Sequence, residues 1–235
     1  YIFFDEIQHV RDFPDIINSL NLKSMVDLYV TGSNAYMLSS EIATLLSGRY
    51  VEIAMLPLSF KEYVEGIGGT DDLSQTYMEY VSKSSFPYTL ELDTASEISD
   101  YLNAVYNTIV VKDIMSRNKL SDVMMLESVI RFTADNIGNI LSTKRIADLM
   151  TADGRKIDQK TVEKYLSAFC ESFFLYECKR YNIKGKQLLK TLGKYYLVDI
   201  GLRRMLLGSR SFDAGRILEN NVYLELLRRQ KKVYI

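Results

Sequence analysis

The chain begins with an apolar run, Tyr1 to Phe4, that ends directly in the two acids Asp5 and Glu6. An unbroken apolar run predicts a strand buried on both faces, because a strand covered on one face alternates apolar with polar residues. The residues that follow predict a helix over 13–20 and a second apolar strand over 26–31. Strand, helix and strand in this order predict the parallel sheet of an α/β fold.

The next residues continue the same pattern. We expect a helix over about 35–46, a third strand over 50–55 and a short helix after Ser59. The glycine-rich stretch 66–72 is the most linker-like in the chain, and we place the first domain boundary near it. Beyond it, apolar residues recur every three or four positions, so the rest of the chain is predicted to be mainly helical.

The later part of the chain predicts a helix–turn–helix followed by two strands. Ser142 is expected to cap a helix over 143–150, and Asp158 a longer helix that reaches about residue 172. Strands over 173–181 and 195–198 follow. Residues 126–200 therefore resemble a winged helix, so the predicted fold class is α/β followed by a mainly α winged-helix domain.

The second helix of this domain has a predicted core face and a predicted outer face. Its core stripe contains four apolar residues, Val162, Leu166, Phe169 and Phe173. The outward residues are Gln159, Lys160, Glu163, Lys164 and Ser167.

The composition and net charge limit the classes of protein to which this chain can belong. Apolar residues make up 47% and charged residues 25% of the 235 positions, the balance of an ordinary globular protein. The net charge is −1, so any contact with nucleic acid requires a local basic patch. The two cysteines and one histidine lack zinc-site spacing, and no apolar run approaches the ~18 residues of a membrane span. We expect a cytoplasmic protein with reduced cysteines.

The acids after the first strand are candidates for phosphate chemistry. In a P-loop ATPase, an acid at the end of a buried strand helps to hold Mg²⁺ on the nucleotide, and a following glutamate polarises the attacking water. Asp5 and Glu6 have this arrangement, which is that of a Walker B strand. The alternative is a buried strand whose acids cap a helix.

Two further segments suit the same chemistry. The second strand ends in Thr31-Gly32-Ser33-Asn34, where a polar side chain would act as a sensor of the γ-phosphate. Arg49 follows a predicted helix and would stabilise charge on the transferred phosphoryl group. The alternatives are a plain turn at Ser33 and Asn34 and a surface ion pair at Arg49.

Taken in order, these segments resemble the AAA+-related prokaryotic ATPases that carry a C-terminal domain of unknown function. The segments that carry the resemblance are 3–8, 31–34, 46–49, 56–63, 106–109, 112–114, 161–166 and 194–202. The resemblance implies ATP and Mg²⁺ as cofactors, with Asp5 as the magnesium-side acid and Glu6 as the catalytic base. It places Ser33 and Asn34 on the sensor stretch and Arg49 at an arginine-finger position.

The Walker A motif Gly-x-x-x-x-Gly-Lys-Ser/Thr does not occur in the sequence. Family members carry it upstream of the Walker B strand, so we expect that residues before Tyr1 have been removed and that this fragment binds ATP weakly. The segment 216–220 resembles the first helix of a restriction-nuclease-like tail. Glu219 is then a remnant of an acidic site or a surface acid.

The resemblance divides the chain into four parts. Residues 1–68 are the C-terminal part of an AAA+-like ATPase domain and 69–125 a helical lid or linker. Residues 126–200 are the winged helix, and 201–235 begin a truncated nuclease-like domain.

The winged-helix region carries a local excess of positive charge. Between residues 142 and 190 there are 11 Lys and Arg residues against 6 Asp and Glu residues. The candidate contacts with DNA phosphates are Arg155, Lys156, Lys160, Lys164, Lys184 and Lys186. The alternative is a solvated face on a domain that binds protein or serves as a lid.

We therefore expect an ATPase fragment coupled to a winged helix that acts on double-stranded DNA, on a protein partner or within a homo-oligomer. The alternative is a regulatory module that binds DNA or protein without ATP turnover.

Overall fold

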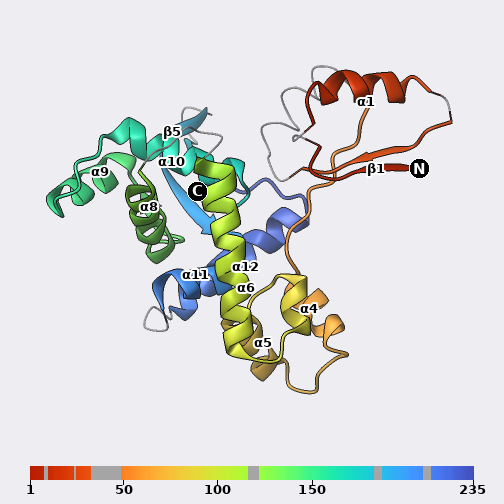
Figure 1. Cartoon of the computed structure of the whole chain (residues 1–235). Helices are drawn as coiled ribbons and strands as arrows, with labels where there is room; N and C mark the ends of the chain where they lie inside the picture. The colour runs from red at the N-terminus through yellow and green to blue at the C-terminus, as the bar shows by residue number, and fades with distance from the viewer. Residues whose placement is uncertain (8–9, 24, 33–48, 116–121, 183–186, 209–212) are drawn as a thin grey trace. The chain divides into compact units, whose positions relative to one another are not determined.

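A computed structural model describes residues 1–7, 10–23, 25–32, 49–115, 122–182, 187–208 and 213–235 (Figure 1). The chain forms two compact units. The first unit contains Tyr1–Ala54 together with Glu171–Phe173, and the second contains Met55–Cys170 and Phe174–Ile235. The fold is mixed α/β and mostly helical, with a small sheet in each unit.

In the first unit, strands β1 (Ile2–Phe4) and β2 (Leu28–Val30) pair in parallel, with Ile2 opposite Leu28. Helix α1 (Phe13–Asn21) lies along one side of this pair (Figure 1). It packs there because its apolar face meets the inward residues of both strands. The cluster consists of Ile7, Phe13 and Ile17 with Phe4, Leu28 and Val30.

The other face of β1 and β2 is exposed, so the prediction of a strand buried on both faces is wrong for the described residues. Phe3 and Tyr29 are 72% and 46% exposed, and their rings stack with centroids 4.8 Å apart. Every second residue of the apolar run therefore packs against α1, whereas the aromatic rings of the alternate residues are exposed to solvent.

The predicted third strand over 50–55 is also wrong, because these residues form no ladder within the described chain. Val51, Ile53 and Met55 are instead largely exposed, at 87%, 76% and 87%. The helix expected over 35–46 lies outside the described residues.

The second unit begins with helices around one large core. Helix α4 (Phe60–Gly66) starts at Ser59 in a capping box with Glu62, as the sequence predicts for Ser59. The helices that follow are α5 (Leu73–Ser82), the 3₁₀ helix η3 (Pro87–Glu91), α6 (Ala95–Asn107), the π-helical η4 (Thr108–Met115) and α8 (Val123–Asp135). The centre of the core lies on α8, where Leu126, Val129 and Ile130 are fully buried.

The helices predicted over 143–150 and from Asp158 to about residue 172 are confirmed, whereas the second predicted strand begins at Gln187 and not at Tyr195. Strand β3 (Ile140–Leu141) precedes α9 (Thr143–Ala152) and α10 (Gln159–Glu171), and β4 (Leu175–Asn182) and β5 (Gln187–Leu197) follow. The sheet has the order β3-β5-β4 and is antiparallel. Helices α11 (Ile200–Leu207) and α12 (Ala214–Arg228) complete the unit.

The predicted faces of α10 are correct except at one position. Val162, Leu166 and Phe169 are buried, and the five predicted outward residues are exposed. Phe173 is wrong as a core residue, since α10 ends before it and it is 36% exposed. Its φ of 57° turns the chain so that Phe174, which is fully buried, enters the core instead.

Within the described ranges, no helix combines the length and apolar character that crossing a membrane requires.

Candidate functional site

The carboxyl ends of β1 and β2 bring Asp5, Glu6 and Thr31 together. The Thr31 hydroxyl donates a hydrogen bond to the Asp5 carboxylate, and the Glu6 amide donates to that hydroxyl at 3.3 Å. Two backbone bonds fix the register, from Thr31 N to Phe4 O at 2.8 Å and from Ile7 N to Thr31 O at 3.3 Å. These groups meet because parallel strands end at the same edge of their sheet.

At this edge the backbone turns at Glu6, away from the direction of β1. Its φ of 48° is left-handed, a conformation that costs about 1–2 kcal/mol for a residue with a side chain. The turn aims the Glu6 amide at Thr31 and lets Ile7, which is 3% exposed, enter the core with α1. Strained backbone of this kind is concentrated at functional sites.

The edge is open to solvent and rich in oxygen atoms. Asp5 and Thr31 are exposed, and Glu6 is half-buried. Carboxylate and hydroxyl oxygens are ligands that suit Mg²⁺, directly or through water. Thr31 was not among the predicted site residues, although its place at the end of the neighbouring strand is a signal that identifies it.

The other predicted residues of this site are placed only in part. Ser33 and Asn34 lie outside the described residues. Arg49 is described, and its guanidinium donates to the Asn18 side chain of α1 at 3.4 Å.

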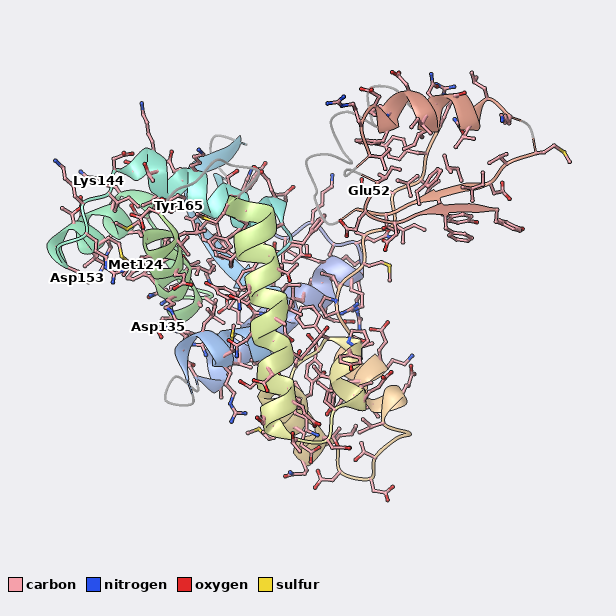
Figure 2. The ribbon with its side chains drawn as sticks, in the orientation of Figure 1. Glu52, Met124, Asp135, Lys144, Asp153 and Tyr165 are labelled. Carbon is pink, nitrogen blue, oxygen red and sulfur yellow. The ribbon has the colours of Figure 1, made fainter. Side chains whose placement is uncertain are left out.

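The predicted DNA-contacting residues lie on or next to α9 and α10. Lys156, Lys160 and Lys164 are exposed, whereas Lys184 and Lys186 lie outside the described residues. Arg155 is turned toward α8, where it donates to the Ser128 hydroxyl and, at 3.4 Å, to the Met124 carbonyl. In Figure 2, Lys144 at the start of α9 points away from the unit, whereas the ring of Tyr165 lies among its packed side chains.

A buried carboxylate, Asp199, joins distant parts of the second unit. It accepts hydrogen bonds from the Ser84 hydroxyl at 3.1 Å, the Ser85 amide at 2.6 Å and the Ser85 hydroxyl at 2.7 Å. Its other oxygen caps α11 by accepting from Leu202 N at 2.7 Å. Burial raises the pKa of Asp199, and these donors oppose that rise.

Gly201 allows this junction to form. A Cβ at position 201 would lie 2.3 Å from the Lys83 carbonyl oxygen and 2.8 Å from the Asp199 carboxylate. Only glycine therefore fits where α11 approaches the backbone before Ser84.

Glu219 and Asn220 on α12 bind strand β5. Glu219 accepts from Lys194 Nζ at 2.7 Å and from the Tyr196 hydroxyl at 2.6 Å. Partial burial tends to raise the pKa of Glu219, but these two donors hold it below its usual range. The buried Asn220 amide both accepts from Leu197 N at 2.8 Å and donates to Leu197 O at 2.9 Å. Both side chains therefore fasten α12 to the sheet.

Sequence comparison finds two families within the chain. Residues 1–64 match an AAA domain, of the P-loop NTPases, and residues 74–213 match a Domain of unknown function (DUF8612). An uncharacterized protein of Haemophilus influenzae is 39% identical over 232 residues, which cover 97% of this chain and 58% of that protein. An uncharacterized protein of Methanocaldococcus jannaschii is 29% identical over 238 residues, with 97% and 53% covered. The chain thus spans a little more than half the length of these relatives.

Proposed function

The chain belongs to the family of the Domain of unknown function (DUF8612), and from this premise we propose that it carries the acidic half of an ATP site and couples it to a winged helix. The match of residues 1–64 to an AAA domain supports nucleotide binding, which is general in that family. The observation that carries the proposal is the junction of Asp5, Glu6 and Thr31 at the sheet edge.

Each residue has a role in this proposal. Asp5 holds the magnesium side of the nucleotide, and the Thr31 hydroxyl fixes the orientation of the Asp5 carboxylate. Glu6 positions and polarises the attacking water, and its left-handed backbone sets the direction of its side chain. Magnesium-bound ATP would supply the phosphoryl group that this water attacks. Ser33, Asn34 and Arg49 are proposed to contact the γ-phosphate.

The test is Glu6→Gln in the full-length protein. We expect ATP hydrolysis to fall by ~10²- to 10⁴-fold, the usual contribution of a general base, while ATP binding persists. The measurements are phosphate release and retention of radiolabelled ATP. Glu52→Gln is the matched control, because Glu52 is an exposed glutamate of the same unit. Unchanged hydrolysis in Glu6→Gln would show that Glu6 is not the base.

A second candidate function is DNA binding by residues 126–200. The order helix, strand, helix, helix and two strands, with sheet order β3-β5-β4, supports a winged helix. The exposed Lys160 and Lys164 lie one turn apart on α10 and suit phosphate contacts.

A gel shift on duplex DNA at several salt concentrations tests this candidate. We expect binding to weaken steeply with salt, and the slope of log K against log salt to fall by ~2 in the variant Lys160→Ala/Lys164→Ala. Gln159→Ala/Ser167→Ala, which changes exposed neutral residues of the same helix, is the control. Absence of a shift at low salt would favour the alternative, a regulatory module that binds protein.

A further inference from the structure

Helix α12 ends in a turn that fixes the direction of the residues after it. Arg229 follows the last helical residue, and Gln230 adopts the left-handed conformation, with a φ of 55°. The Gln230 amide donates to the Leu227 carbonyl at 2.8 Å, and the Lys231 amide donates to the Leu226 carbonyl at 2.9 Å. These two bonds are those of a Schellman motif, which usually has glycine at the left-handed position. The turn is therefore specific, and it holds a residue with a side chain in an unfavourable conformation.

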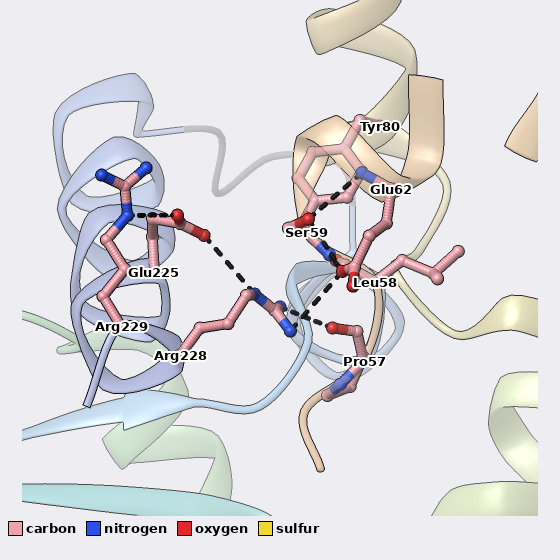
Figure 3. A network of polar contacts seen from close by, with 8 residues as sticks. All are labelled: Pro57, Leu58, Ser59, Glu62, Tyr80, Glu225, Arg228 and Arg229. Atoms are coloured by element: carbon pink, nitrogen blue, oxygen red, sulfur yellow. Dashed lines mark hydrogen bonds and ion pairs between the residues drawn. The ribbon is translucent and has the colours of Figure 1, made fainter. Parts of the chain in front are cut away.

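Arg228 anchors the last turn of α12 within the second unit (Figure 3). Its guanidinium donates to the Pro57 carbonyl at 2.6 Å and pairs with the Glu62 carboxylate at 3.6 Å. It also pairs with Glu225 of its own helix at 3.4 Å. The guanidinium is planar and carries five donors, so one side chain can engage three acceptors at once. The turn after α12 thus begins at an anchored helix end.

Beyond this turn, the backbone of the chain pairs with the outer edge of β4. The Ile235 amide donates to the Lys179 carbonyl at 3.2 Å, and the Tyr181 amide donates to the Ile235 carbonyl at 2.7 Å. Because Ile235 bonds to both neighbours of Arg180, it lies opposite Arg180 in a parallel pairing. Strand β4 pairs with β5 along its other edge. Residues 233–235 therefore cover the edge of β4 that has no partner among the described strands.

Side chains hold the same segment against the sheet and α12. Val233 and Ile235 pack on an apolar cluster whose buried members are Cys178, Tyr196, Tyr223 and Leu224. The Cys178 thiol donates to the Val233 carbonyl at 3.5 Å. The rings of Tyr181 and Tyr234 lie 5.7 Å apart between their centroids. The segment is thus fixed by its backbone and by its side chains.

We propose that residues 233–235 form an edge strap, which occupies the outer edge of β4 and prevents a second copy of the chain from pairing there. An unpaired strand edge presents N–H and C=O groups that serve as a template for another strand. The Tyr181 amide and the Lys179 carbonyl are two such groups, and the edge strap satisfies both. The exposed Lys231 and Lys232 directly before it carry the charge that protects strand edges in other proteins. This inference is independent of the proposed ATP site.

The experiment compares two substitutions at one position of the full-length protein. Ile235→Pro removes the N–H that donates to the Lys179 carbonyl, because proline has no backbone N–H. Ile235→Ala is the matched control, since it shortens the side chain but keeps this donor. Sedimentation velocity over a range of protein concentrations measures the oligomeric state. Amide hydrogen exchange at low protein concentration measures the protection of the peptide that covers 175–182.

In Ile235→Pro, exchange at the Tyr181 amide should become about 10-fold faster, because the bonds of the edge strap are lost. A species larger than that of the parent protein should also appear as the concentration rises. Ile235→Ala should keep the oligomeric state of the parent and show a smaller change in exchange, because both backbone bonds remain possible.

Three results would overturn the inference. Unchanged exchange in Ile235→Pro would show that residues 233–235 do not protect the edge of β4. Faster exchange without a larger species at any concentration would show that the freed edge does not pair with a second copy. Equal association of Ile235→Pro and Ile235→Ala would assign the association to the shortened side chain and not to the strand edge.

Discussion

Asp199→Ala should lower the free energy of unfolding of the second unit by about 3–5 kcal/mol, because several buried donors lose their acceptor and each unsatisfied buried donor costs about 1–3 kcal/mol. The substitution leaves four donors without an acceptor, namely the Ser84 hydroxyl, the Ser85 amide and hydroxyl, and the Leu202 amide. Asp199 is only 1% exposed, so water cannot replace the lost carboxylate without opening the structure. Urea unfolding followed by far-ultraviolet circular dichroism measures the change.

Asp72→Ala is the matched control for this substitution. Asp72 caps α5 by accepting from Gln75 N at 2.9 Å, but it is exposed, so its loss should cost only about 1 kcal/mol. If Asp199→Ala cost no more than Asp72→Ala, Asp199 would act as an ordinary helix cap and the buried junction would add nothing. If Asp199→Ala fails to fold, Asp199→Asn, which keeps one acceptor oxygen, should fold with reduced stability.

Asn220→Ala should cost about 2–4 kcal/mol, because it leaves both backbone groups of Leu197 without a partner. Asn220 and Leu197 are both fully buried. The Asn220 amide therefore takes the place of a neighbouring strand at the end of β5. Its loss also leaves the Leu197 N–H without its acceptor, so hydrogen exchange of this amide should become faster.

The neighbouring Asn221 provides the control. Its amide donates to the Tyr77 hydroxyl at 3.0 Å, and the residue is half-buried. Asn221→Ala should therefore cost about 1 kcal/mol, the value of a single hydrogen bond. Equal losses from the two substitutions would mean that the Leu197 groups find other partners.

The elements that are predicted correctly are those specified by residues close together in the sequence. The strand–helix–strand order of residues 1–31 and the caps at Ser59, Ser142 and Asp158 follow from patterns within a few residues. The third strand over 50–55 is predicted from its local apolar pattern, whereas a strand requires a partner that its own residues do not specify. Phe173 was misplaced because a helix period does not reveal the left-handed turn that follows α10.

The candidate site likewise contains residues that a local pattern indicates and residues that only the folded structure brings together. Asp5 and Glu6 are recognisable as candidates because a Walker B role would require acids directly after an apolar strand. The contact between Arg228 and Pro57 is not recognisable from the sequence, since these residues are 171 positions apart and each is ordinary in its local context. Thr31 is intermediate, because it becomes a site residue once the two strands are placed in parallel.

The bonds from Ser85 to Asp199 also bear on how the chain folds. They join positions 114 residues apart, so closing them confines a long loop and costs entropy that no local contact offsets. The helix caps, by contrast, form between residues three positions apart. During synthesis, α4 and α5 leave the ribosome long before Asp199 does, and the Ser84–Ser85 donors remain solvated until it arrives. The junction at Asp199 therefore cannot form before the chain has been synthesised beyond residue 199.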